Sequence, residues 1–260
     1  ALIDGDIVAY RAAASAEKEE EDIALIRTDK TMGDILNEVG ATGHKTFLSG
    51  SREDNFRTKI CDQYKINRVS VPRPQHLEAC KMFLITHYKA VRCTHYEADD
   101  ALGMEQKLSG TIICSIDKDL LMIPGHHYNF VKKEYREVTE DQGLKSFYLQ
   151  VLTGDTSDNV IGLKGIGPVK AAKILDPLLP EEYYYACTKA YEGDIERLNK
   201  NCKLLWIWRH PNQVWEPPVG DSKEPPLKAR EHEEHVCSRE NETGDDEQNR
   251  DSLLSVPGHT

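Results

Sequence analysis

The sequence predicts an α/β protein with a mainly parallel sheet flanked by helices. Short apolar segments typical of strands alternate with longer segments in which apolar residues recur at helical spacing. This alternation is typical of layered α/β folds. Several apolar segments are followed at once by acidic residues, at the edge where ligands gather in a parallel sheet. With 260 residues and 39% hydrophobic content, the chain is long enough to bury a core.

The expected elements follow in chain order. ALID and KTFLS are short apolar strands, and TIICSI is the strongest strand signal. The expected strands are 1–4, 45–49, 91–94, 111–116 and 127–131. QHLEACKMFLITHYK has apolar residues at helical spacing, and Pro168 suits the first position of a helix. The expected helices are the later part of 17–38, then 75–89, 98–108, 139–152, 168–175, 181–191 and 194–208.

Two segments depart from this pattern. RTKICDQYKINRVSVPRP, residues 57–74, is basic and interrupted by prolines, so we expect an exposed segment with limited helix. From Pro217 onward the chain is rich in Glu, Asp, Pro, Ser and Asn and nearly lacks aromatic residues. Such a composition cannot bury enough apolar surface to offset the entropy of ordering. We therefore expect residues 217–260 to form an acidic, disordered tail.

Charge and cysteine content limit the class of protein. The net charge is −11, but the tail holds 11 acidic against 5 basic residues, which leaves −5 for residues 1–216. Eight of the remaining carboxylates are candidate metal ligands, so the charge does not exclude a polyanionic substrate. No apolar run approaches the ~18 residues of a membrane span, and no signal sequence opens the chain. Seven cysteines without a C-x-x-C pair indicate free thiols and a reducing, cytoplasmic compartment.

Acidic residues cluster after predicted strands and at helix starts. Taken singly, each cluster has a structural explanation, because carboxylates are common in first turns of helices and in loop turns. Converging on one sheet edge, however, they would repel one another unless protonated or coordinated. The clusters are DGD (Asp4 and Asp6), YEADDALG (Glu97, Asp99 and Asp100), SIDKDL (Asp117 and Asp119) and TGDTSDN (Asp155 and Asp158).

This donor set predicts a site for hard divalent cations. The oxygens of Asp and Glu suit Mg²⁺ or Mn²⁺, and no companion His/Cys set competes. Two such ions, roughly 3.5–4 Å apart, can activate a water and stabilise the leaving oxygen in phosphodiester hydrolysis. The clusters do not name the substrate. HEEHVC, residues 232–237, lies in the polar tail without further ligands, so we do not predict a zinc site there.

A glycine-rich turn follows the last acidic cluster. In GLKGIGPVKAAKIL, Gly165 and Gly167 would let backbone N–H groups approach a phosphate beside a helix N-terminus. Lys164, Lys170 and Lys173 add positive charge. An ordinary loop-to-helix turn has the same pattern, but behind an aspartate pair it indicates contact with a DNA backbone, without sequence specificity.

YKINR is the second basic feature. It supplies Tyr64, Lys65 and Arg68. Such a run is commonly a solvated face. The alternative is a phosphate clamp, in which arginine offers a bidentate grip and the tyrosine ring stacks on a base.

Taken together, these motifs resemble the 5′-nuclease (flap endonuclease) family, which includes the 5′ nuclease domain of bacterial DNA polymerase I and phage 5′–3′ exonucleases. The resemblance covers residues 1–176, and because no polymerase follows, we expect a phage-type enzyme. The motifs that carry it are DGD, FRTKICDQYKINR, YEADDALG, SIDKDL and TGDTSDNVIGLKGIGPVKA.

The resemblance implies a fold and an activity. We expect a PIN-like nuclease core over 1–150 with a helical arch at about 52–90. Residues 151–216 would form a helix-three-turn-helix and C-terminal helices that grip duplex DNA, often with K⁺. The activity implied is two-metal hydrolysis with Mg²⁺ or Mn²⁺ near DNA 5′ ends or flaps, in replication, repair or phage DNA metabolism. We expect a monomer.

The resemblance also assigns roles to individual residues. Lys65 and Arg68 would contact the scissile phosphate, and Arg11 would contact DNA. The metal ligands implied are Asp4, Glu97, Asp99, Asp100, Asp117, Asp119, Asp155 and Asp158.

Three positions depart from the family pattern. The family usually has an aspartate seven residues before the arginine of the F-R pair, and Gly50 stands there. Asp54 is nearby but out of register. Val169 occupies a position where lysine is common, with Lys170 one step later. Asp6 sits where the family tolerates many residues, which leaves it as a group that could support the ligands.

Other functions remain open on the sequence alone. D-x-D after a first strand also fits haloacid-dehalogenase-type phosphatases, but that reading leaves the glycine turn and YKINR unexplained. A PIN-type ribonuclease shares the core chemistry. A non-catalytic DNA-binding module would keep the glycine turn but would not need eight carboxylates.

Overall fold

One sheet of six strands organises the part of the chain that the computed structural model describes, residues 1–218. The strand order is β3-β2-β1-β4-β5-β6; β1 to β5 pair in parallel, and β6 pairs antiparallel with β5. The strands are β1 (Leu2–Asp4), β2 (Lys45–Leu48), β3 (Val91–Arg92), β4 (Ile112–Cys114), β5 (Gly125–Asn129) and β6 (Glu134–Val138). A separate hairpin joins β7 (Gly154–Asp155) to β8 (Val160–Ile161).

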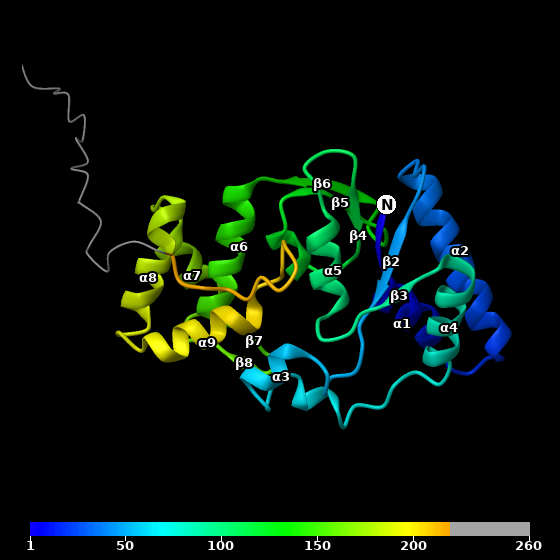
Figure 1. Ribbon diagram of the computed structural model, residues 1–260, viewed down its shortest axis with the longest axis horizontal. Coiled ribbons are helices and arrows are strands. Elements are labelled where there is room, and N and C mark those ends of the chain that lie inside the picture. Colours follow the sequence, from blue (N-terminus) through cyan, green and yellow to red (C-terminus); the bar gives the residue numbers. More distant parts are fainter. Residues whose placement is uncertain (219–260) are drawn as a thin grey trace, which may run out of the picture. The chain divides into compact units, whose positions relative to one another are not determined.

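Helices cover both faces of the sheet, which is why the central strands are continuous apolar runs. Figure 1 shows α1, α2 and α4 together at one side of the sheet, and α6 to α9 beyond the other. The helices are α1 (Gly5–Ser15), α2 (Glu21–Glu38), α3 (Phe56–Ile60), α4 (Leu77–Tyr88), α5 (Ala98–Glu105), α6 (Glu140–Thr153), α7 (Pro168–Leu175), α8 (Tyr183–Ala190) and α9 (Ile195–Leu205). Short 3₁₀ turns are η1 (Ile66–Arg68), η2 (Asp119–Met122) and η3 (Pro180–Glu182).

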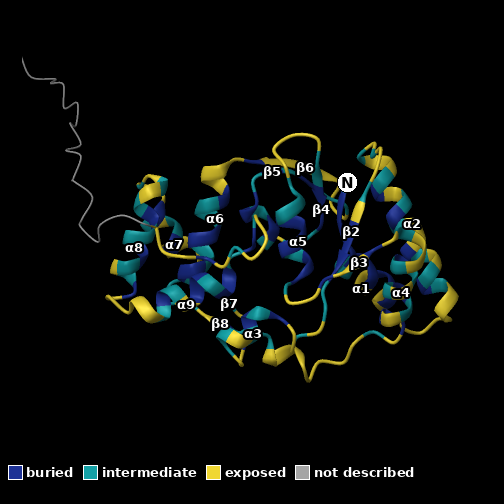
Figure 2. Cartoon of the chain, in the orientation of Figure 1, coloured by how far each residue is buried: buried dark blue, intermediate teal, exposed yellow. Residues whose placement is uncertain are grey.

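The core lies in two clusters, one on each side of the sheet. Ile3 and Leu48 pack with Val8 and Leu84 beneath α1 and α4. On the other side, Leu102 and Phe147 belong to a larger cluster that extends into α7, α8 and α9. Figure 2 shows the buried residues concentrated along the strands and on the inward sides of these helices.

The parallel register brings the strand ends together. Leu2 of β1 is paired with Lys45 of β2 on one side and with Ile113 of β4 on the other. The carboxyl ends of β1, β2 and β4 therefore lie side by side. Asp4 ends β1, Ser49 follows β2 and Ser115 follows β4. This is the edge at which the sequence places its acidic residues.

The predicted mainly parallel α/β fold is confirmed, and most expected elements are present. The helix expected at 168–175 has these bounds, with Pro168 as its first residue. Four elements were not expected. Helix α1 is alanine-rich with little amphipathic pattern and depends on its Asp4 N-cap, whose carboxylate accepts a hydrogen bond from the Ile7 N–H. Strand β6 is mostly exposed and highly charged, and β7 and β8 have two residues each.

The arch segment, residues 52–90, is helical only in part. It contains α3, η1 and α4, but residues 69–76 between η1 and α4 have no regular helix. Pro72 and Pro74 explain this, because proline lacks the N–H that a helix interior needs. Figure 2 shows this connection as a long, mostly exposed segment without regular secondary structure. The arch segment is thus helical at its two ends, with α3 and η1 at one end and α4 at the other, and extended between them.

The described residues belong to one compact unit. The boundary expected between 150 and 151 falls inside α6, and the division into two domains remains a prediction. All but the first two residues of the predicted tail at 217–260, including the HEEHVC motif, lie outside the described residues. No helix in residues 1–218 is both long and apolar enough to cross a membrane.

Candidate active site

Asp4 is the innermost carboxylate of the site. It is buried at the end of β1, where it caps α1 and accepts a 2.7 Å hydrogen bond from the Ser115 hydroxyl. Burial, together with the negative charges of Asp6 and Asp117, raises the pKa of Asp4 to about 7. A cation that approached Asp4 would stabilise its ionised form.

Helix α5 contributes two more carboxylates from its N-terminus. Burial and the negative charges of Asp4, Asp117 and Glu97 raise the pKa of Asp99 well above its usual range. Glu97 behaves in the opposite way. Burial alone would raise the pKa of Glu97, but the positive charges of Lys65 and Arg57 lower it to about 2. Glu97 is therefore already compensated by cations of the chain, whereas Asp4 and Asp99 are not.

The third group lies between η2 and the β7–β8 hairpin. Burial and the negative charges of Asp117 and Asp155 raise the pKa of Asp119 to about 7. The Asp155 carboxylate accepts backbone hydrogen bonds from Ser157 at 2.7 Å and Asp158 at 3.2 Å. Asp155 therefore shapes the turn that carries Asp158, which is the turn role that the sequence also allowed.

The donor chemistry of this edge suits a hard divalent cation. The carboxylates are buried or half-buried, carry oxygen donors only, and raise one another's pKa values. Within residues 1–218, no three His, Cys, Asp or Glu side chains stand in an arrangement that could hold a metal ion as they are. Coordination would thus require the carboxylate side chains to rotate toward the ion. The positive charge of the ion would then offset the repulsion between the carboxylates.

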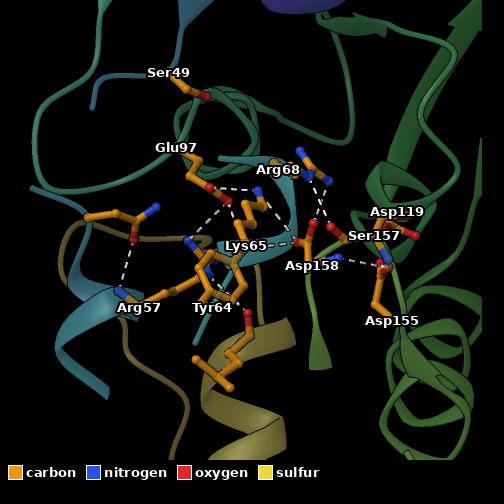
Figure 3. A network of polar contacts seen from close by, with 12 residues as sticks. Ser49, Arg57, Tyr64, Lys65, Arg68, Glu97, Asp119, Asp155, Ser157 and Asp158 are labelled. Atoms are coloured by element: carbon orange, nitrogen blue, oxygen red, sulfur yellow. Dashed lines mark hydrogen bonds and ion pairs between the residues drawn. The ribbon is translucent and has the colours of Figure 1, made fainter. Parts of the chain in front are cut away.

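Lys65 and Arg68 reach this edge from the arch segment. Figure 3 shows Lys65 between Glu97 and Asp158, with its ammonium 2.6 Å from Glu97 Oε1 and 3.4 Å from Asp158 Oδ2. Arg68 pairs with the other oxygen of Asp158 and donates to the Ser157 carbonyl. The Lys65 backbone is in the left-handed region at φ 54°, and its N–H donates to the Asp158 carbonyl. The structure therefore brings both predicted clamp residues to the carboxylates.

Tyr64 corrects one expectation from the sequence. Its side chain is 2% exposed, so the ring is not available to stack on a base. The hydroxyl instead lies 3.0 Å from Glu97 Oε2 and 2.9 Å from Asp158 Oδ2, bridging carboxylates of two chain segments (Figure 3). The basic composition of YKINR predicts an exposed ring. Burial against the core decides otherwise.

Asp100 also differs from the role that the resemblance implies. Its carboxylate is completely buried and binds Arg57 through both oxygens, at 2.6 and 2.8 Å. It also accepts hydrogen bonds from the N–H groups of Glu97 and Trp208. With its oxygens occupied in this way, Asp100 does not face the other carboxylates as a free ligand. Arg57, which the sequence did not single out, is its partner, and its near-complete burial gives the residue a structural role.

Gly50, at the departure from the family pattern, has no room for a side chain. A Cβ atom there would lie 2.3 Å from the Cys93 carbonyl oxygen. Asp6 instead brings a carboxylate to this part of the edge, where it accepts a 2.7 Å hydrogen bond from the Ser49 N–H. Lys81 of α4, a second residue that the sequence did not single out, lies 2.7 Å from the other Asp6 oxygen. The sequence pattern that could have indicated Lys81 is its position among Leu77, Cys80 and Leu84, on the inward face of α4.

The remaining predicted DNA contacts lie away from the carboxylates. Gly165 has φ +76°, and neither it nor Gly167 has another atom within 4 Å of an added Cβ, so the turn before α7 is open to solvent. Three exposed lysines flank this turn: Lys164, Lys170 and Lys173. Arg11 is exposed on α1 and lines a cavity of about 610 Å³ with Lys30 and Lys133. The structure does not bring Arg11 to Lys65 and Arg68.

Residues 1–148 match the family model described as the 5′-3′ exonuclease, N-terminal resolvase-like domain. The chain belongs to this 5′-3′ exonuclease family. Among its relatives is the 5′-3′ exonuclease of Buchnera aphidicola subsp. Schizaphis graminum, 26% identical over 196 residues, which cover 67% of this chain and 68% of that protein. DNA polymerase I of Borreliella burgdorferi is 35% identical over 203 residues, covering 71% of this chain and 22% of that protein.

Two solved structures share the fold. The T5 D15 protein crystallised with metal ions superposes with a TM-score of 0.61 at 17% identity, covering 78% of this chain and 88% of that one. T5 5′-exonuclease with zinc bound gives 0.61 at 18% identity with the same coverage. The 5′-nuclease resemblance and the PIN-like sheet expected from the sequence are thereby confirmed.

Proposed function

We propose that this protein is a metal-dependent, structure-selective DNA nuclease that acts near 5′ ends, as a 5′–3′ exonuclease and flap endonuclease. The observation that supports this best is the gathering of carboxylates from four chain segments at one sheet edge, directly beside Lys65 and Arg68. Family membership supplies the reaction class. A T5 D15 flap endonuclease structure with 17% identity and TM-score 0.60 is a complex with DNA and metal ions.

Two Mg²⁺ or Mn²⁺ ions are the cofactors that this donor set suits. One ion would be held by Asp4, Glu97, Asp99 and Asp117. The other would be held by Asp119, Asp155 and Asp158. When bound, such ions supply an activated water and stabilise the leaving oxygen. We leave Asp100 out of the ligand set, because Arg57 and two backbone N–H groups already occupy its oxygens.

Lys65 and Arg68 are the chain's own groups for the scissile phosphate. Without substrate they neutralise Glu97 and Asp158. A phosphate entering the site would offer them new oxygens, and cations at the carboxylates would release them. Tyr64 would keep the Glu97 and Asp158 carboxylates together during this exchange, because its hydroxyl bridges the two.

Duplex DNA would extend from this edge toward the turn before α7. There the open backbone at Gly165 and Gly167 would approach a phosphate, with Lys164, Lys170 and Lys173 as counter-charges. In this proposal the turn belongs to a helix-three-turn-helix that binds K⁺ and duplex DNA, and Arg11 is a peripheral DNA contact. The working form would be a cytoplasmic monomer whose partner is DNA with a 5′ end or flap.

A labelled 5′-flap duplex tests the proposal. The protein is incubated with the flap, labelled at each end in turn, in Mg²⁺ or EDTA. Asp155→Ala is assayed beside it, with the exposed surface residue Asp34 changed to alanine as the matched control. We expect Mg²⁺-dependent release from the 5′ side, lost in Asp155→Ala and retained in Asp34→Ala.

Two results point to other functions. Binding without cleavage in any metal would indicate a DNA-binding module. Preferential cleavage of an RNA version of the substrate, in direct competition with DNA, would indicate a PIN-type ribonuclease. Absence of any interaction with nucleic acid would contradict the proposal.

A further inference from the structure

A cavity of about 630 Å³ lies between the arch segment and the carboxyl edge of the sheet. We call it the arch cavity. Its charged lining includes Lys65 and Arg68 at η1, Glu97 at the start of α5, Asp6 in the first turn of α1 and Lys81 in α4. Its volume falls within the range of ligand-binding cavities, about 300–1,000 Å³.

Lys81 is an unusual lysine. Its side chain is only 14% exposed, on a helix face that otherwise packs Leu77, Cys80 and Leu84 inward. Lysines are rarely buried to this degree unless paired. Its one partner among the described residues is Asp6, with the ammonium 2.7 Å from Oδ1. Because an ammonium group carries three N–H donors, this ion pair leaves donors for another acceptor.

Asp6 fixes the position of that ammonium. Its second oxygen accepts the Ser49 N–H at 2.7 Å, which ties the carboxylate to the end of β2. Asp6 lies two residues after Asp4 in the chain, so the Lys81 ammonium is held at the same carboxyl edge of the sheet. Lys65 and Arg68 line the same cavity but are occupied by Glu97 and Asp158. In the substrate-free state, Lys81 is thus a cavity cation that has donors left over and whose position is fixed by its ion pair with Asp6.

We propose that Lys81, positioned by Asp6, is a further substrate-binding residue that contacts a phosphate of the cleaved DNA strand in the arch cavity. This inference rests on the proposed nuclease function and names the part of the substrate that the cavity takes. The phosphate is either the terminal 5′-phosphate or an internal phosphodiester of the same strand. Both present the anionic oxygens that a lysine ammonium binds.

Binding without catalysis is the direct test. The affinity for a labelled 5′-flap duplex is measured by fluorescence anisotropy in EDTA, over a series of salt concentrations, for the wild type and Lys81→Met. A lysine that contacts phosphate contributes about 0.9 to the slope of log K against log salt. We expect Lys81→Met to bind about 5–20-fold more weakly and to lower that slope by about 1. Lys45→Met, which breaks the exposed Lys45–Glu105 pair outside the cavity, is the matched control and should keep the wild-type slope.

A double variant separates substrate binding from a purely structural ion pair. If Lys81 only compensates Asp6, Asp6→Asn/Lys81→Met removes both charges and restores wild-type affinity and slope. That result would overturn the proposal. The proposal predicts that the double variant binds as weakly as Lys81→Met, with the same lowered slope.

Two substrates identify the phosphate. If Lys81→Met loses affinity for 5′-phosphorylated DNA but not for 5′-hydroxyl DNA, the contact is with the terminal phosphate. If it loses affinity equally for both, the contact is with an internal phosphate. Unchanged affinity and slope in Lys81→Met, for a wild type that cleaves the flap in Mg²⁺, would refute this inference and leave the nuclease standing. A wild type that neither binds nor cleaves DNA would instead refute the proposed function.

Discussion

Arg57 and Asp100 form a bidentate ion pair that is buried at the centre of the molecule. The arginine is 2% exposed and the aspartate 0%. Arg57 also donates to the Leu204 and Trp206 carbonyls, and Asp100 accepts the Trp208 N–H. The pair thus joins α3, the start of α5 and the segment that follows α9. This connection fixes the arch segment's first helix against the active-site helix.

Breaking this pair should destabilise the protein strongly. Asp100→Asn removes the bidentate partner of the buried Arg57 and leaves only the more distant Glu97, at 3.7 Å, as a counter-charge. We expect a loss of about 3–5 kcal/mol in the free energy of unfolding. Denaturant unfolding in EDTA measures it. The surface pair Lys30–Asp34, with side chains 70% and 66% exposed, is the matched control, and Asp34→Asn should cost less than about 1 kcal/mol. A small effect of Asp100→Asn on stability, with weaker Mn²⁺ binding, would instead make Asp100 a metal ligand.

Lys65→Met should impair cleavage far more than it impairs folding. The variant removes a charge that we place at the scissile phosphate, and losses of about 10²–10³-fold are usual for such groups. The measurement is single-turnover cleavage of the 5′-flap duplex in Mg²⁺. Lys133→Met, an exposed lysine outside the arch cavity, should retain activity. Cleavage by Lys65→Met within a few-fold of wild type would remove Lys65 from the reaction.

Gly50→Asp should not restore the aspartate that the family usually has at this position. The new Cβ would lie 2.3 Å from the Cys93 carbonyl oxygen, so the backbone must shift. We expect a loss of about 1–3 kcal/mol in stability, which is typical of overpacking. Gly43→Asp is the matched control, because nothing lies within 4 Å of its added Cβ. Thermal unfolding of both variants measures the loss. Unchanged stability of Gly50→Asp together with tighter Mn²⁺ binding would show that this edge of the sheet can accept an aspartate as a further metal ligand.

His127 should make stability depend on pH. It is buried in β5, and its ring nitrogen donates to the Ile123 carbonyl. Burial and the positive charges of Arg136 and Arg209 lower the pKa of His127, although the hydrogen bond to Ile123 opposes this. The histidine is then neutral in both states above about pH 6.5, the ordinary value. Below it, the unfolded chain binds a proton that the folded protein excludes, so the stability contribution is lost as the pH falls.

Denaturant unfolding between pH 8 and pH 5 measures this effect. We expect wild-type stability to fall relative to His127→Gln below about pH 6.5, by at most about 1.4 kcal/mol per pH unit. Comparison with the variant is needed because other groups also titrate in this range. Burial and neighbouring carboxylates raise the pKa values of Asp4 and Asp119 to about 7, which acts in the opposite direction. Parallel curves for the two proteins would contradict the prediction.

The sequence alone determined the layered fold and the place of the site. Strand ALID ends on Asp4 because a buried parallel strand is apolar throughout and stops where polar groups begin. Helix 168–175 could be located because proline and glycine act locally. The sequence also indicated that Lys65 and Arg68 accompany the carboxylates, through their resemblance to the family motif. These signals depend on residues near one another in the chain.

Tertiary structure decided which polar groups face the substrate and which hold the fold together. The sequence does not tell whether Tyr64 and Asp100 are exposed or buried. Packing places the Tyr64 ring in the core and pairs Asp100 with Arg57. Lys81 meets Asp6 only because α4 packs on α1, although the two residues are 75 positions apart in the chain. The functional value of a charged side chain depends on its desolvation and on its partners, and both are set by contacts between distant segments.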